Sequence, residues 1–281
     1  MANTTTSYGS RIMNIECNGA TAVDIIVDGI RLEAAWYGPA ADQVPTLVFL
    51  HEGLGCLALW RDFPYRLAEA TGCSAFVYSR QGYGRSDPAR LPRTVDFMHH
   101  EALRVLPGVL RAAGIRRAVL VGHSDGGSIA LIYAGSGMPG IELLGVVTEA
   151  AHVFCEAVTI SSIIRAKQDF EAGDLRQRLA RYHGDNTDGA FYSWNGPWLD
   201  PDFLHWNIEP YLATVTVPVL AIQGENDPYG TQAQVEAIIR NTGAESLILP
   251  DCGHSPHLQQ PAATLEAMAR FILGLNGSVK S

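Results

Sequence analysis

Cysteine is scarce in this sequence, and the positions of its cysteines argue against two kinds of stabilising site. The 281 residues include five cysteines, which are scattered along the chain without a Cys-x-x-Cys pair. Structural zinc sites and disulfide frameworks usually have closely spaced or regularly paired cysteines. A chain of this length buries about three quarters of the surface that its unfolded form exposes, so its core can stabilise the fold without a disulfide or a zinc site. We therefore expect reduced, mostly buried thiols, as in a cytoplasmic protein.

Long apolar runs are also missing. No stretch of about 18 apolar residues occurs, which predicts that no helix crosses a membrane. The first eight residues, Met-Ala-Asn-Thr-Thr-Thr-Ser-Tyr, are polar, so no secretory signal is expected. Because 29 acidic residues outnumber 20 basic ones, the net charge is −9. That balance argues against nucleic acid or an anionic membrane as a partner.

Short apolar segments recur along the chain and alternate with segments of helical spacing. Such alternation predicts an α/β fold with a mostly parallel central sheet and helices on both faces. The Asp28-Gly29 turn predicts that the first two strands form an antiparallel hairpin. Expected strands are 23–27, 30–36, 46–50, 75–78, 118–121, 143–148, 218–222 and 246–249. Expected helices are 59–70, 94–113 with a break or kink at Pro107, 128–134, 232–240 and 262–275.

One long segment interrupts this alternation. Residues 150–212 contain no convincing strand and are rich in aromatic side chains. The segment is too long to be a simple connection. We therefore expect a helical cap over the carboxyl edge of the sheet, inserted after the sixth strand into a core of residues 1–149 and 213–281. Residues 1–20 have the composition of a loose tail.

The strongest chemical signal is a Gly-x-Ser-x-Gly motif between an expected strand and an expected helix. It reads Gly122-His123-Ser124-Asp125-Gly126 and is followed by Gly127. A tight strand-to-helix turn requires glycine two residues before and after the serine, and it exposes the serine hydroxyl above the sheet. The N–H of Asp125 then lies at the positive end of the helix, where it can stabilise an oxyanion.

The Ser124 hydroxyl needs a base that removes its proton. The chain contains nine histidines, and their positions relative to the expected strands select the candidate base. His254 follows the last expected strand and Asp227 follows the one before it, so both should lie at the carboxyl edge of the sheet. Asp227 would orient the His254 ring, although an aspartate before a proline also commonly begins a turn. Glu149 and Asp251 are weaker candidates for the same acid. His257 lies three residues after His254, but no further ligand completes a metal site, so we expect neither a metal nor another cofactor.

The loop after strand 46–50 reads His51-Glu52-Gly53-Leu54-Gly55. Its glycines allow a backbone N–H, that of Gly53, to face a bound carbonyl oxygen. The alternative is a glycine-rich turn without a catalytic role. We further expect His152, which follows the sixth strand, to line the pocket together with Leu54. Trp194 and Trp206 would either contact substrate or form the internal core of the cap.

Together these motifs resemble the α/β-hydrolase family of serine hydrolases, over nearly the whole chain. The order Ser124, Asp227, His254 matches the order of the family's triad. Gly82-Tyr83-Gly84-Arg85-Ser86 resembles the family's loop after the fourth strand. Two departures stand out. Ser79 and Arg80 occur where an aspartate is common, and Glu52 occurs where glycine is usual, so it either forms a salt bridge within the loop or moves the oxyanion donor by one residue.

The resemblance implies a serine hydrolase that acts on a small-molecule substrate. A small carboxylic ester is the first expectation, with lactones and thioesters next. Carbon–carbon bond hydrolysis of ring-cleavage products would use the same triad. An aminopeptidase would need an acidic group for the substrate amine, with Glu149, Glu156 and Glu209 as candidates. A binding module that closes its cap on a small molecule is the non-enzymatic alternative, and the oligomeric state stays open, with a homodimer among the options.

Overall fold

The structure is a computed structural model that describes residues 20–138 and 140–277. The tail expected over 1–20 lies outside the described residues, apart from residue 20, and so does Cys17. The four described cysteines are free thiols, and three of them are buried. Among the described residues, no helix is both long and apolar enough to span a membrane.

Within the described residues, eight strands form one sheet in the order β1-β2-β4-β3-β5-β6-β7-β8. The first pairings, β1 with β2 and β2 with β4, are antiparallel, and the remaining ones are parallel. Every strand expected from the sequence is present, which confirms the predicted fold class. Their bounds are β1 Thr21–Val27, β2 Ile30–Tyr37, β3 Thr46–Leu50, β4 Ser74–Tyr78, β5 Arg117–His123, β6 Glu142–Glu149, β7 Val219–Gly224 and β8 Glu245–Leu249.

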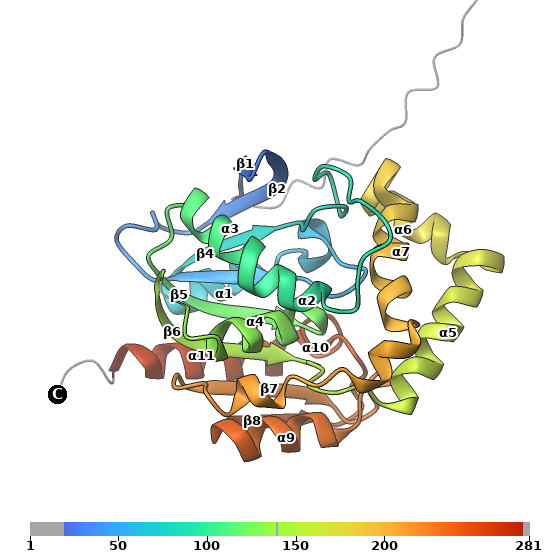
Figure 1. Cartoon of the computed structure of the whole chain (residues 1–281). Coiled ribbons are helices and arrows are strands. Elements are labelled where there is room, and N and C mark those ends of the chain that lie inside the picture. Colours follow the sequence, from blue (N-terminus) through green and yellow to red (C-terminus); the bar gives the residue numbers. More distant parts are fainter. Residues whose placement is uncertain (1–19, 139, 278–281) are drawn as a thin grey trace, which may run out of the picture.

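Helices cover both faces of the sheet (Figure 1). Side chains of β3 alternate between two cores: Leu47 and Phe49 face one, and Val48 and Leu50 face the other. Such alternation follows from the two-residue period of a strand. The first core packs α1 (Phe63–Thr71) and α11 (Pro261–Gly277). The second packs α3 (Leu106–Ala112), α4 (Asp125–Gly135) and α9 (Gln232–Thr242).

The helix expected over 94–113 is divided into three pieces. It consists of α2 (Phe97–His100), a π-helical turn (Glu101–Val105) and α3. Pro107, the second residue of α3, lies just after the π-turn inside this continuous helical stretch, where its missing N–H removes one helical hydrogen bond. The break therefore precedes Pro107 and takes the form of a π-turn. Shorter elements elsewhere are the 3₁₀ turn Leu57–Trp60 and α10 (Pro256–Gln259).

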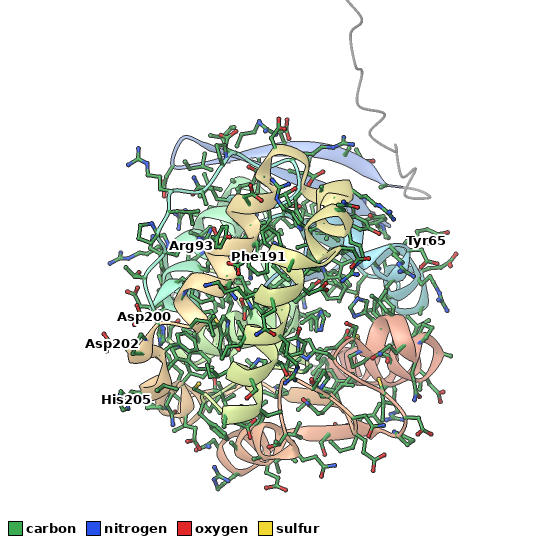
Figure 2. The ribbon with its side chains drawn as sticks, turned by 90° about the vertical axis from the view of Figure 1, so that its right-hand side faces the viewer. Tyr65, Arg93, Phe191, Asp200, Asp202 and His205 are labelled. Carbon is green, nitrogen blue, oxygen red and sulfur yellow. The ribbon has the colours of Figure 1, made fainter. Side chains whose placement is uncertain are left out.

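Residues 150–212 contribute no strand to the sheet. Their helices α5 to α7 lie side by side beyond one edge of the core (Figure 1), and Figure 2 shows them turned toward the viewer with Phe191 of α7 near the middle. Phe191 stacks on Phe170 of α5 at a centroid distance of 3.7 Å, so these helices share an apolar core. The elements are α5 Ala157–Ala172, α6 Leu175–His183, α7 Thr187–Trp198, α8 Glu209–Leu212 and the 3₁₀ turns Gly184–Asn186 and Pro201–His205.

We propose that residues 150–212 form the inserted cap, with residues 1–149 and 213–281 as the core. At the end of this segment, Leu212 of α8 is fully buried in the core cluster that also contains Ile129 of α4 and Val235 of α9. The returning end of the segment therefore packs against α4 and α9, which cover the sheet.

Candidate active site

Ser124 occupies a strained backbone position between β5 and α4. Its φ of 52° and ψ of −118° lie where side chains other than glycine rarely occur. The turn is tight on both sides: a Cβ on Gly122 would lie 2.3 Å from the carbonyl oxygen of Gly126, and one on Gly126 would lie 1.9 Å from that of Leu50. The two motif glycines are therefore required by close backbone contacts, as expected from the sequence.

Asp227 and His254 meet at the carboxyl edge of the sheet, from the loops after β7 and β8. His254 Nδ1 lies 2.8 Å and 2.9 Å from the two carboxylate oxygens of Asp227. The carboxylate also accepts from the Tyr229 N–H and from Gln223 Nε2, both at 2.8 Å. Burial acts to raise the pKa of Asp227, but its hydrogen bond to His254 and the other contacts outweigh burial and lower it. The ionised carboxylate keeps the proton on His254 Nδ1, which leaves Nε2 able to accept a proton.

Ser124 and His254 line one cavity with a volume of about 80 Å³. No hydrogen bond joins the Ser124 hydroxyl to the His254 ring within the described residues. In unliganded enzymes such contacts are often longer than in the substrate complex. The walls of the cavity are mostly apolar and include Leu54, His152, Ile163, Trp194, Trp198 and Tyr229.

The expected pocket residues divide into two groups. Leu54, His152 and Trp194 line the cavity, as the sequence predicts. Trp206 is not among the lining residues. Its ring stacks on Phe203 at 5.2 Å and lies 5.9 Å from the ring of Trp198. Trp206 therefore belongs to the aromatic core that packs against the lining residue Trp198. This corrects its expected place in the pocket.

The Gly53 N–H belongs to the peptide that joins Glu52 and Gly53. The carbonyl oxygen of that peptide is already hydrogen-bonded within the protein. Glu52 O accepts from Arg80 Nη2 at 3.0 Å and from the Gly55 N–H at 3.1 Å. Because the C=O and N–H of a trans peptide point in opposite directions, these bonds turn the Gly53 N–H the other way. Neither this N–H nor that of Asp125, in the first turn of α4, bonds to any described residue. Both residues line the cavity, so two N–H groups remain free for a ligand oxygen.

Arg80 hydrogen-bonds to two residues of this loop. Its buried guanidinium donates from Nη1 to the carbonyl oxygen of His51 at 3.0 Å and from Nη2 to that of Glu52. Its own N–H donates to His51 Nε2, also at 3.0 Å. Sequence reasoning identified Arg80 only as a departure from a family pattern and missed this function. The neighbouring Ser79 hydroxyl donates to Glu33 Oε2 at 2.8 Å, so it too has a structural partner.

Glu52 forms an ion pair outside its own loop. Its Oε2 lies 3.4 Å from Nδ1 of His123, the residue before Ser124. Burial acts to lower the pKa of His123, but Glu52 outweighs it and raises the value to about 9; the imidazolium in turn lowers the pKa of Glu52. His123 Nε2 donates to the carbonyl oxygen of His254 at 2.6 Å. The pair therefore joins three loops of the site, an arrangement that differs from both alternatives expected for Glu52.

Neither rival acid hydrogen-bonds to the His254 ring among the described residues. Glu149 is fully buried, and its Oε2 lies 2.8 Å from Nδ1 of His257, which places His257 in the core beneath the site. Asp251 is exposed. The three glutamates considered for binding an amine do not line the cavity: Glu149 is paired as described, Glu156 accepts from Thr231 and Gln234, and Glu209 accepts from Asn207 and Arg240.

A model of the alpha/beta hydrolase family matches residues 47–267. Among curated proteins, a 2-succinyl-6-hydroxy-2,4-cyclohexadiene-1-carboxylate synthase of Salmonella paratyphi C (strain RKS4594) is 23% identical over 273 residues, which cover 85% of this chain and 98% of the relative. Similar solved structures include a membrane phospholipase A described as a bacterial virulence factor (TM-score 0.73, 20% identity, 92% and 87% coverage of this chain and that one) and the esterase RhEst1 from Rhodococcus sp. ECU1013 (TM-score 0.69, 18% identity, 90% and 99% coverage). At these identities the structural likeness concerns the fold.

Proposed function

This chain belongs to the alpha/beta hydrolase family, and on that premise we propose that it is a serine hydrolase that cleaves a small carboxylic ester. Ser124 is the nucleophile, His254 the base, and Asp227 the acid that orients the base. The observation that carries the proposal is the 2.8 Å contact between Asp227 and His254 at the cavity that Ser124 also lines.

In the proposed mechanism, His254 Nε2 removes the proton of the Ser124 hydroxyl as its oxygen attacks the ester carbonyl carbon. The N–H groups of Gly53 and Asp125 stabilise the oxyanion of the tetrahedral intermediate. Its collapse expels the alcohol, which takes the proton from His254 and leaves an acyl group on Ser124. Water then repeats the sequence, with His254 as base and afterwards as acid, and releases the carboxylic acid. Asp227 stays ionised throughout and stabilises the imidazolium.

The cavity supports a small, largely uncharged substrate. Its aliphatic and aromatic walls suit an apolar acyl or alcohol group. Lactones and thioesters would pass through the same steps and are the next candidates. The structural likeness to an esterase is consistent with this order but bears only on the fold.

The activity named for the Salmonella relative is less well supported. That name describes a product with a succinyl group and a further carboxylate, so its carboxyl groups are anionic at neutral pH. The described lining of the cavity contains no lysine or arginine and includes the acidic residues Glu52 and Asp125. A substrate carboxylate that entered this cavity would lose its hydration without meeting a cationic side chain in the described lining, which is unfavourable. We therefore place polyanionic substrates below neutral esters.

Covalent labelling tests whether the serine is reactive. A fluorophosphonate probe should label the protein at Ser124 and should not label Ser124→Ala. The same variant should lose about 10⁶-fold in kcat while keeping its thermal unfolding midpoint. Labelling without catalytic turnover would favour a binding module, and unimpaired turnover by Ser124→Ala would refute the assignment.

A substrate panel then ranks the remaining alternatives. It contains p-nitrophenyl esters of increasing acyl length, lactones, thioesters, aminoacyl anilides and a ring-cleavage dienone. We expect the highest kcat/KM for short neutral esters. Faster turnover of the dienone would favour carbon–carbon bond hydrolysis, and faster turnover of the anilides would favour an aminopeptidase.

A further inference from the structure

His183, the last residue of α6, contacts two loops of the core through its ring nitrogens. Its Nδ1 accepts from the Gly84 N–H at 3.0 Å, and its Nε2 lies 3.0 Å from the carbonyl oxygen of Leu54. A backbone N–H only donates and a carbonyl oxygen only accepts, so the neutral ring carries its proton on Nε2. The side chain is buried, and burial lowers the pKa of His183, which keeps the ring neutral near pH 7.

The Leu54 carbonyl group is linked to the proposed oxyanion donor through the backbone. It belongs to the peptide between Leu54 and Gly55, and the N–H of that same peptide donates to the carbonyl oxygen of Glu52 at 3.1 Å. The Glu52 carbonyl group in turn shares a peptide with the Gly53 N–H. Because the C=O and N–H of a trans peptide are held rigidly in opposite directions, two peptide planes and one hydrogen bond connect the His183 ring to the donor.

His183 comes from a different part of the chain than the loop that it holds. It lies in residues 150–212, the proposed cap, whereas residues 51–55 follow β3 in the core. His183 is not among the residues that line the cavity. Any effect of this side chain on the reaction is therefore exerted through the backbone of the loop and not by contact with the substrate.

We propose that His183 is a positioning residue through which the cap holds the Gly53 N–H in the orientation that stabilises the oxyanion. The inference rests on the proposed function for the role of that N–H. It makes the cap a part of the catalytic apparatus, because the oxyanion site is complete only while α6 is seated on the loop after β3. An interaction that strengthens as charge develops on the carbonyl oxygen affects kcat more than KM.

Two variants at position 183 keep one contact each. His183→Gln places an amide nitrogen near ring Nε2, so it still donates to the Leu54 carbonyl oxygen but offers no acceptor to the Gly84 N–H. His183→Asn places an amide oxygen near ring Nδ1, so it still accepts from Gly84 but loses the donor to Leu54. With the best ester of the panel, we expect the asparagine variant to lower kcat about tenfold at nearly constant KM, and the glutamine variant to keep about half of kcat.

Asn186 provides the matched control, because it fastens the same end of α6 to the core without contacting Leu54. Its Nδ2 donates to the carbonyl oxygens of Gly84 at 3.2 Å and Ser86 at 2.7 Å. Asn186→Ala should lower the thermal unfolding midpoint and leave kcat unchanged. If His183 were only structural, kcat would instead follow the loss of stability in all of these variants.

Amide hydrogen exchange gives a second readout that needs no turnover. In protein labelled with ¹⁵N at its glycines, the Gly55 N–H should exchange about fivefold faster in His183→Asn than in the wild type, and should be unchanged in Asn186→Ala. In the wild-type protein, the ring ¹⁵N chemical shifts of His183 should show the neutral tautomer with its proton on Nε2 at pH 7.

The inference is overturned if His183→Asn keeps the wild-type kcat or changes only KM, if His183→Gln or Asn186→Ala loses as much kcat, or if Gly55 exchange is unchanged in His183→Asn. A wild-type ring protonated on Nδ1 would overturn it even if no variant folds. Faster Gly55 exchange in His183→Asn, in a protein whose wild type hydrolyses no ester, would contradict the proposed function and leave the link between His183 and the loop in place.

Discussion

Arg80 Nη2 donates a hydrogen bond to the carbonyl oxygen of Glu52 over 3.0 Å, and this contact, together with those of His51 Nδ1 at 2.7 Å and the Gly55 N–H at 3.1 Å, holds the orientation of the next peptide N–H. A buried guanidinium thus supports the loop that carries the proposed oxyanion donor, and it does so without touching the cavity itself. A residue that acts through the backbone in this way should affect the transition state more than the binding of substrate.

We therefore expect Arg80→Met to lower kcat by about 10²–10³-fold with little change in KM, which is the typical cost of losing one oxyanion donor. Arg80→Lys should retain part of the activity because it keeps one cationic donor. Steady-state kinetics on the best ester measure both values. Arg85→Met, at a residue with an exposed side chain, is the matched control. A rise in KM at constant kcat would show that Arg80 serves substrate binding instead.

The pair of His123 and Glu52 predicts a loss of stability at alkaline pH. The raised pKa of His123 means that the native state holds a proton that the unfolded state releases above pH 6.5. Stability from the pair is therefore complete below about pH 6.5 and is lost as pH rises through 9, with a slope of about 1.4 kcal/mol per pH unit. Urea unfolding at pH 6.5, 7.5 and 8.5 measures this slope.

His123→Gln should flatten that dependence, since glutamine does not titrate. A wild-type unfolding free energy that stays constant from pH 6.5 to 8.5 would contradict the ion pair. Removal of the partner by Glu52→Gln should flatten the dependence as well, because an unpaired buried His123 no longer holds its proton in this range.

A side chain larger than hydrogen at position 53 should disturb the wall of the cavity. A Cβ at this position would lie 2.0 Å from Cδ1 of Trp194, so Gly53→Ala must displace the indole from the cavity wall. We expect kcat/KM to fall at least about tenfold, because a small displacement near reacting groups is costly. Gly189→Ala in α7 is the control: nothing lies within 4 Å of its added Cβ, and alanine should stabilise the helix by up to about 1 kcal/mol. Equal activity of the two variants would contradict the close contact.

The hydrogen bond between Trp198 of α7 and Asp125 should contribute to the free energy of unfolding. Trp198→Phe removes the hydrogen bond to the buried Asp125 carboxylate and should lower the free energy of unfolding by about 1–3 kcal/mol. Trp206→Phe provides the comparison, since Trp206 Nε1 has no partner among the described residues and loses no such bond. Chemical denaturation of both variants gives the difference. A larger loss in Trp206→Phe would contradict the assigned importance of the Trp198–Asp125 contact.

Local patterns in the sequence determined the strands, the turn at Ser124 and the order of the three proposed triad residues. Strand periodicity and tight-turn stereochemistry depend on residues that are neighbours in the chain, so 46–50 and 118–121 could be recognised as strands in isolation. The carboxyl ends of parallel strands share one edge, which is why Asp227 and His254 could be expected near Ser124.

Only the tertiary structure decided which side chains meet across segments that are far apart in sequence. The partner of Glu52 is His123, 71 positions later, and the carbonyls that Arg80 holds belong to residues 51 and 52. Trp194 and Trp206 have similar sequence surroundings, yet one lines the cavity and the other packs behind it. Such pairings depend on packing and on the match of buried donors with acceptors, and neither leaves a periodic signal in the chain.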